Sequence, residues 1–262
     1  MTASVAALVS TSCKPNVRSL ISRPGAADPL PSVGFSKSAE QSRICIIVQN
    51  ESVNSSYIYR TDGPGNPRAN HFCLAMTILT TARLSLVPFT DDHVDGLNVL
   101  NSDPEVMRYI SGRPETRDET VAAVEQVKRR WIEFGYSWWS FIDRDSSEIV
   151  GAGALQNLRR DATTAPDPAC PLEVGWRLRR DCWHRGLATE AARAIVGFAF
   201  DTIRAEELYA VCNPDNVASA SVMKRLGMQN CGLQTWYGKS LATYQTNAHQ
   251  YLAASGIDAL GP

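Results

Sequence analysis

The chain of 262 residues has no apolar run that approaches the roughly 20 residues needed to cross a bilayer. It has no C-x-x-C pair, and its seven cysteines are odd in number and widely scattered, which argues against a zinc site and a secreted disulfide scaffold. Its formal net charge of −1 gives no basic surface for nucleic acid. These absences predict a cytoplasmic protein with reduced thiols, no metal, no membrane contact and no nucleic-acid partner.

Residues 1–75 differ in composition from the rest of the chain. They hold seven Lys/Arg against four Asp/Glu, whereas residues 76–262 hold 19 against 23. The first 38 residues contain eight serines and one acid, a composition that buries too little apolar surface to offset the entropy of ordering. We therefore expect residues 1–75 to be a disordered leader, a mis-assigned start with Met76 as the biological first residue, or a targeting peptide. A single domain is expected over 76–262.

From Ala82 onward, alternating and helical patterns follow one another closely. The first expected strand ends at Pro88, which predicts an edge strand. The longest expected helix should bury a stripe that contains Val121, Val124 and Trp131. Further strands are expected at 138–142, 149–155, 172–178, 208–212 and twice within 231–252, and helices at 92–100, from 104, 119–134, 187–203 and 216–226. Antiparallel hairpins followed by two strand-helix units predict an α+β (mixed α/β) sheet with helices on both faces.

The most informative segment is Trp183–Ala191 (W-H-R-G-L-A-T-E-A), where a short loop centred on Gly186 leads into an alanine-rich helix. The first turn of a helix has backbone N–H groups without intrahelical partners and carries partial positive charge, so it attracts anions. The glycine allows close approach to the main chain. We expect a diphosphate to be held by the backbone of His184, Arg185, Gly186, Leu187, Ala188 and Thr189, with a possible hydroxyl donor at Thr189.

This loop, the strand-like L-E-V-G-W-R-L over 172–178 and the N-P-D-N-V-A-S block that begins at Asn213 together resemble the acyl-CoA site of the GNAT acetyltransferases. With D-P-E-V-M-R-Y over 103–109, the chain is similar to the RimJ/RimL-type branch. The resemblance implies the GNAT fold, a mostly antiparallel sheet whose strands splay at the CoA site. It also implies acetyl transfer from acetyl-CoA to a protein N-terminal α-amine or a small-molecule amine by direct attack in a ternary complex, in a monomer or homodimer.

The resemblance also suggests the residues that perform the chemistry. Glu173 corresponds to a glutamate that often acts as general base; the alternative is an exposed strand carboxylate paired with Arg177 or Arg179. Because the family splays this strand, the main chain of Trp176, Arg177 and Leu178 is the expected donor to the thioester carbonyl.

The next helix offers the remaining candidates. Asn216 either caps its helix or faces the pantetheine arm of CoA. In many family members a tyrosine at the position of Met223 protonates the departing thiolate. Methionine cannot donate a proton, so Ser219 is the candidate for this role here, and solvent is the alternative. His184 stands where the family commonly has glycine.

Several features have simpler explanations. Gly151 and Gly153 lack the third glycine of a dinucleotide site and are expected to pack closely within the sheet. Cys182 is expected to be a packed thiol rather than a nucleophile. The aromatic residues Trp138, Trp139, Trp176, Trp236 and Tyr237 either line an acceptor pocket or belong to the core. The missing tyrosine leaves one alternative function, a non-catalytic acyl-CoA-binding or sensing module.

Overall fold

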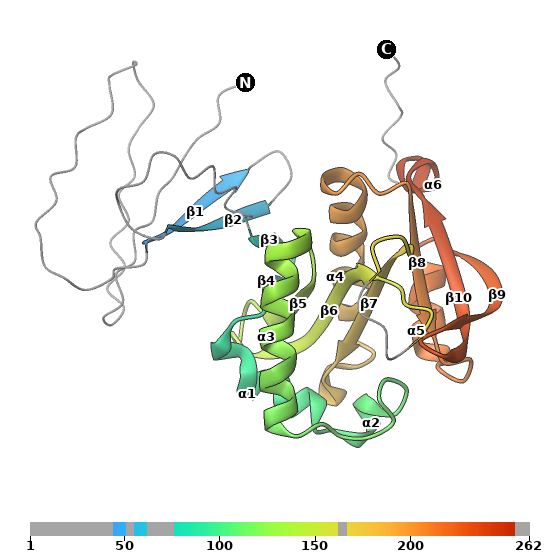
Figure 1. Cartoon of the computed structure of the whole chain (residues 1–262), viewed down its shortest axis with the longest axis horizontal. Helices are drawn as coiled ribbons and strands as arrows, with labels where there is room; N and C mark the ends of the chain where they lie inside the picture. Colours follow the sequence, from blue (N-terminus) through green and yellow to red (C-terminus); the bar gives the residue numbers. More distant parts are fainter. Residues whose placement is uncertain (1–43, 51–54, 62–75, 162–166, 255–262) are drawn as a thin grey trace, which may run out of the picture.

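The computed structural model describes residues 44–50, 55–61, 76–161 and 167–254, and its strands form one ten-stranded sheet (Figure 1). The strand order is β1-β2-β3-β4-β5-β6-β7-β8-β10-β9, and every pair is antiparallel except β7 with β8. The strands are β1 Ile44–Asn50, β2 Ser55–Thr61, β3 Met76–Thr80, β4 Leu84–Pro88, β5 Trp138–Asp143, β6 Ile149–Asn157, β7 Leu172–Leu178, β8 Glu207–Cys212, β9 Gln229–Trp236 and β10 Lys239–Asn247.

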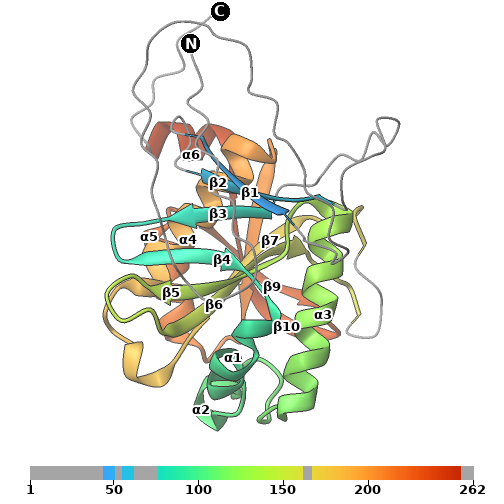
Figure 2. The ribbon, with the colours of Figure 1, turned by 90° about the vertical axis from the view of Figure 1, so that its left-hand side faces the viewer.

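Helices cover both sides of the sheet, so the predicted fold class is confirmed. Figure 1 and Figure 2 place α3 on one side and α4 on the other. The helices are α1 Val94–Asn101, α2 Pro104–Met107, α3 Arg117–Phe134, α4 Leu187–Gly197, α5 Val217–Arg225 and α6 Ala248–Ala254, and α4 continues as a π-helical turn over Phe198–Thr202.

The helices begin where the sequence supplies capping side chains. Asp103 accepts a hydrogen bond from Glu105 N–H at 2.8 Å and so caps α2, as expected. Thr116 and Glu119 form a capping box at the start of α3, and the left-handed Gly135 ends that helix. Local chemistry therefore accounts for these boundaries.

Three expectations about the elements were wrong. The strand that ends at Pro88 lies between β3 and β5 rather than at an edge; the proline is tolerated because β3 pairs only with Ser85 and Leu86. Val121 is 37% exposed on α3. Residues 248–254 form α6 instead of continuing the last strand, and Asn247 caps its first turn by accepting from Gln250 N–H.

Residues 1–75 were predicted to be a disordered leader, a mis-assigned start or a targeting peptide. Residues 1–43, 51–54 and 62–75 lie outside the described residues. The two described strands between them pair with each other, and β2 pairs with β3. Whether residues 1–75 belong to the native protein stays a prediction.

The core fills the space between the sheet and the helices. Trp139 is fully buried, with the rings of Trp131 and Phe198 edge-on to it at 4.9 and 5.5 Å, so it belongs to the core and not to a pocket. The expected close packing of the β6 glycines is confirmed, because a Cβ on Gly153 would lie 2.4 Å from the ring of Phe141.

No helix among the described residues is long and apolar enough to span a membrane. The same residues contain no cluster of three or more His, Cys, Asp or Glu suited to a metal ion.

Candidate active site

The two parallel strands β7 and β8 separate almost at once. They share a single paired position, Glu173 with Tyr209, near the start of each strand. Beyond it the strands diverge toward their carboxyl ends, where α4 follows β7 and α5 follows β8. The amino ends of both helices therefore lie at the edge of the sheet where the strands have opened, which is where open α/β sheets bind ligands.

Within this opening, β7 presents main-chain groups that no neighbouring strand pairs. Arg179 N–H donates to Val150 O at 2.8 Å, and the β6–β7 register is continuous from Gly151 with Leu178 onward. Because backbone groups alternate sides along a strand, Arg177 N–H points to β6, whereas the amides of Trp176 and Leu178 point into the opening. This assignment narrows the expected carbonyl donors to Trp176 and Leu178.

The loop before α4 exposes backbone amides for an anion. Gly186 is the N-cap residue in the left-handed region, with φ of 79°, and no side chain caps this helix among the described residues. His184, Arg185 and Gly186 are exposed, so the loop is open to a ligand. His184 also has a positive φ of 59°, which explains why related loops favour glycine there. Thr189 is buried and thus poorly placed as a hydroxyl donor.

Contacts that are distant in sequence hold the loop in place. Glu190 accepts from Thr81 Oγ1 at 2.6 Å and forms a salt bridge with Arg83. Arg83 Nη1 then donates to Arg185 O at 2.9 Å, and Trp183 Nε1 donates to the carbonyl of the last β7 residue at 2.9 Å. The hairpin between β3 and β4 thus fixes the position of the loop over residues 184–186, which we call the anion loop.

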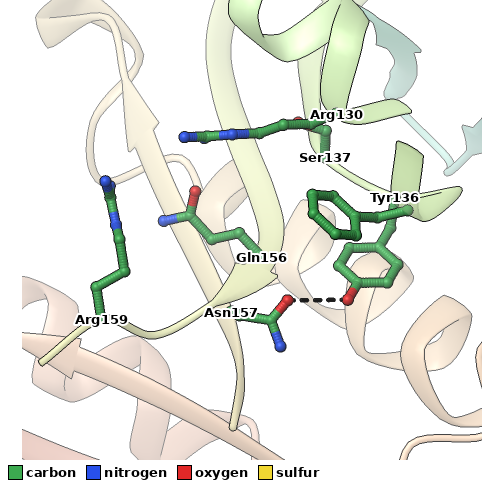
Figure 3. A pocket seen from close by; sticks show the side chains of 7 residues that line it. Arg130, Tyr136, Ser137, Gln156, Asn157 and Arg159 are labelled. Carbon is green, nitrogen blue, oxygen red and sulfur yellow. Dashed lines mark hydrogen bonds between the residues drawn. The ribbon is translucent and has the colours of Figure 1, made fainter. Parts of the chain in front are cut away.

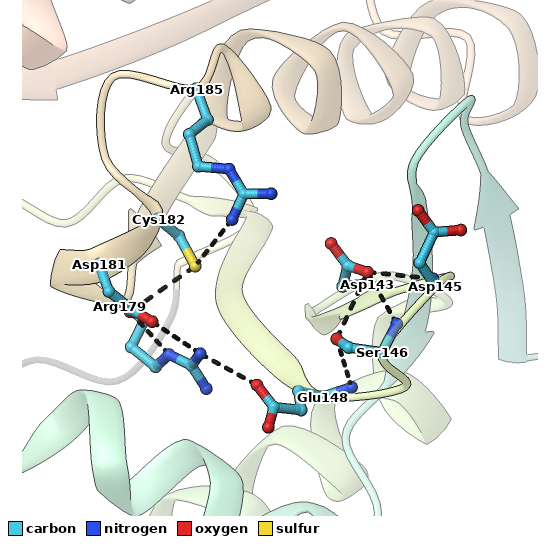
Figure 4. Close-up of polar contacts among 8 residues, drawn as sticks. All are labelled: Asp143, Asp145, Ser146, Glu148, Arg179, Asp181, Cys182 and Arg185. Atoms are coloured by element: carbon cyan, nitrogen blue, oxygen red, sulfur yellow. Dashed lines mark hydrogen bonds and ion pairs between the residues drawn. The ribbon is translucent and has the colours of Figure 1, made fainter.

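Cys182 lies beside a group of polar contacts on the other side of the loop (Figure 4). Arg179 pairs with Asp181 at 2.8 Å and with Glu148 at 3.0 Å, and Arg185 Nη1 lies 3.8 Å from Cys182 Sγ. Cys182 is 1% exposed, and burial raises the pKa of its thiol. The expected packed thiol is confirmed.

Glu173 is a buried carboxyl group, 8% exposed. Burial raises its pKa from 4.5 to about 7, although the hydroxyl of Tyr237 and the amide of Gln156 both donate to Oε2 and oppose that shift. The alternative of an exposed carboxylate paired with Arg177 or Arg179 does not match this geometry, because Glu173 is buried and forms no salt bridge with a described residue. A group with a pKa near 7 can accept a proton at neutral pH and release it again.

Glu173 belongs to a polar face of the sheet. Residues opposite each other in antiparallel strands share a face, so Trp138, Gln156, Glu173, Gly175 and Arg177 all lie on one side; we call these five residues the Glu173 face. The indole Nε1 of Trp138 donates to Gln156 Oε1 at 3.0 Å, which orients the amide toward Glu173.

A small cavity adjoins this face (Figure 3). Its volume of about 10 Å³ has room for roughly one water molecule. Burial and the neighbouring Arg159 lower the pKa of Arg130, so two guanidinium groups face this corner of the molecule. The cavity is lined by Arg130, Phe134, Tyr136, Ser137, Gln156, Asn157 and Arg159.

The start of α5 supports one of the two expectations for Asn216. Its side chain accepts from Ser219 N–H at 3.1 Å, which makes it the N-cap. The Ser219 side chain is partly exposed and makes no hydrogen bond to another described residue. Met223 is 2% exposed in the core.

Sequence reasoning missed the residues that support Glu173 and the loop. Tyr237 was expected either to line an acceptor pocket or to belong to the core, and Gln156, Arg83 and Glu190 were not singled out. The E of A-T-E-A was a usable signal for Glu190, but its partners lie more than 100 residues away. His93 completes a capping box with Thr90, and its Nδ1 lies 3.0 Å from Ser140 Oγ.

Comparison with known proteins identifies the family. Residues 83–229 match the model of the acetyltransferase (GNAT) domain, which is more than half of the chain. The uncharacterized protein YkkB of Bacillus subtilis (strain 168) is 28% identical over 176 residues, 67% of this chain and 98% of YkkB. An FsC-acetyl coenzyme A-N(2)-transacetylase of Aspergillus fumigatus is also 28% identical, over 63% of this chain and 69% of that protein.

Solved structures show the same fold. RimL, a ribosomal L7/L12 α-N-protein acetyltransferase solved with coenzyme A, aligns with a TM-score of 0.54 and 17% identity over 65% of this chain and 97% of RimL. The anion loop, the splayed parallel strands and the matched domain all indicate the same family. The chain therefore belongs to the GNAT acetyltransferase family and is an acyltransferase.

Proposed function

We propose that this protein transfers the acetyl group of acetyl-CoA to a primary amine, as a member of the RimJ/RimL-type branch, by direct attack of the amine in a ternary complex. The motifs at 103–109, 183–191 and 213–219 support the branch, and RimL is among the structural neighbours. The acceptor is a protein N-terminal α-amine or a small-molecule amine. Cytoplasmic location and the choice between monomer and homodimer stay predictions.

The chain's own residues fit acetyl-CoA, which supplies the activated acetyl group as a thioester. The uncapped amides from Leu187 to Thr189 hold the diphosphate, with positive charge from Arg185. The outward-facing amides of Trp176 and Leu178 donate to the carbonyl oxygen as negative charge grows on it; one such donor contributes roughly 3 kcal/mol to the transition state.

Glu173 takes the proton of the acceptor ammonium, directly or through a water. The amine nitrogen then forms a bond to the acetyl carbon while the carbon–sulfur bond breaks, and the nitrogen releases its second proton to solvent. The departing thiolate takes a proton from solvent, directly or through Ser219, which solvent then reprotonates. The single observation that carries this proposal is the buried Glu173, whose pKa lies near 7, on the strand whose free amides face the opening.

Replacing Tyr237 with phenylalanine tests how Glu173 is tuned. The Tyr237 hydroxyl donates to the carboxylate and therefore lowers the Glu173 pKa, so its loss should raise that pKa further. We expect the acidic limb of the kcat/KM profile to move up by roughly one to two pH units, with activity largely recovered at high pH. Tyr109→Phe is the matched control, because the Tyr109 hydroxyl makes no hydrogen bond to another described residue and its ring lies beside Arg108. An unshifted limb would show that Tyr237 does not tune the base.

The activity itself is tested with a panel of amines, including peptides with free N-termini and polyamines, with release of the CoA thiol as the readout. The proposal predicts that at least one amine gives steady turnover. Tight acetyl-CoA binding without turnover for any acceptor would instead support a sensing module.

A further inference from the structure

The Glu173 face surrounds an open space. Gly175 lies between Glu173 and Arg177 on β7, and a Cβ placed on it would meet no atom within 4 Å. Trp138, Ala154 and Gly175 form one row across three strands, because Trp138 pairs with Ala154 and Ala154 pairs with Gly175. The next row on one side holds Gln156 and Glu173, and the next row on the other side holds Arg177.

Arg177 is a partly buried cation with no salt-bridge partner among the described residues. Its Nε is buried and has no hydrogen-bond partner, and the guanidinium forms no salt bridge with the residues that the structure describes. The carbon Cζ lies 4.7 Å from the centre of the Trp138 ring, so the side chain leans back toward the row of Gly175. Burial lowers the Arg177 pKa to about 10, and only the more distant Glu115 opposes that shift.

The charges around this space are mostly positive. Arg159 lies over the Tyr237 ring at 5.2 Å and acts on Glu173, and Arg130 stands close enough to Arg159 for each to affect the other. Arg179, another half-buried arginine, pairs with two acids. A partly buried cation without an anionic partner is destabilising, so its retention beside a base points to an anion supplied from outside the chain.

We propose that the acceptor is a small amine that carries a carboxylate, and that Arg177 binds this carboxylate across the open space above Gly175 while the amine faces Glu173. The proposal rests on the proposed function and defines its substrate class. The planar guanidinium, positioned over the Trp138 ring, is preorganised for a two-point contact with a carboxylate. Gly175 matters because a side chain there would fill the space that the acceptor occupies.

Matched acceptors test the proposal. Glycine, β-alanine, 4-aminobutyrate and L-phenylalanine are each compared with their carboxamides, with CoA thiol release as the readout. We expect at least one acid to exceed its carboxamide in kcat/KM by about tenfold or more, since a charge-assisted pair is lost in the amide. In Arg177→Met this ratio should fall to near one, whereas the exposed Arg129→Met should keep it.

The outcomes separate the two proposals. Equal use of acids and amides, or an unchanged ratio in Arg177→Met, would overturn the carboxylate site while the acetyltransferase activity stands. Turnover only with amines that lack a carboxylate, such as peptide N-termini or polyamines, would overturn it too. An absence of turnover with every amine would overturn the proposed function itself.

A second measurement does not depend on turnover. Removing an unpaired cation should not lower the melting temperature, so Arg177→Met is expected to fold. N-acetylated products of the preferred acids, as carboxylate ligands, should raise the melting temperature of the wild-type protein and not that of Arg177→Met. Equal stabilisation of both proteins would contradict the proposal.

Discussion

Glu173→Gln is expected to lower kcat/KM at pH 8 by about two to four orders of magnitude, because glutamine cannot accept the ammonium proton. The wild-type rate should fall about tenfold for each pH unit below 7, since the Glu173 pKa is about 7 and only its ionised form is a base. This dependence should vanish in the variant. Initial rates measured between about pH 5.5 and 9 test both statements.

The loss should not come from unfolding. The Glu173 pKa is higher in the folded protein, at about 7, than its ordinary 4.5, so the folded state holds this proton more tightly. The free energy of unfolding therefore falls by roughly 3 kcal/mol from this group as pH rises from about 4.5 to 7. Glutamine does not ionise and so avoids this loss. Glu173→Gln should therefore be at least as stable as the wild-type protein at pH 8.

Acetyl-CoA affinity, measured by calorimetry, should be largely unchanged in Glu173→Gln. Glu105→Gln, an exposed change on α2, is the control for the rate. A wild-type pH profile in Glu173→Gln would remove Glu173 from the mechanism.

Gly186→Val is expected to weaken acetyl-CoA binding by about tenfold to a hundredfold. The residue has a φ of 79°, which a β-branched side chain adopts only with strain on the order of 1–3 kcal/mol, and it stands where the diphosphate would meet the amides of α4. Calorimetric titration with acetyl-CoA measures the change.

Gly112→Val separates this effect from simple strain. Gly112 has nearly the same φ, 80°, and nothing within 4 Å of its added Cβ, but it belongs neither to the loop nor to α4. Both variants should lose stability, and only Gly186→Val should lose affinity. Undiminished uptake of acetyl-CoA by folded Gly186→Val would disprove the role of the loop.

The parts of the site that could be predicted are those encoded locally. The anion loop depends on one glycine and the helix that follows it, and the side of the sheet that carries Glu173 follows from strand alternation. Burial could not be predicted, because Tyr237 reaches Glu173 from 64 residues away and Arg83 reaches the loop from 102 residues away. Those contacts depend on the order of the strands in the sheet. The same order explains why the strand that ends at Pro88 lies inside the sheet and not at the predicted edge.

The single pairing between β7 and β8 divides the sheet into two blocks, β1 to β7 and β8 with β10 and β9. Only side-chain packing and the connecting chain hold these blocks together beyond that point. A ligand that hydrogen-bonds to the unpaired amides of β7 therefore bridges the two blocks. Part of its binding energy then stabilises the contact between them. Slower deuterium uptake across β8 and β10 would then report occupancy of the site without any turnover.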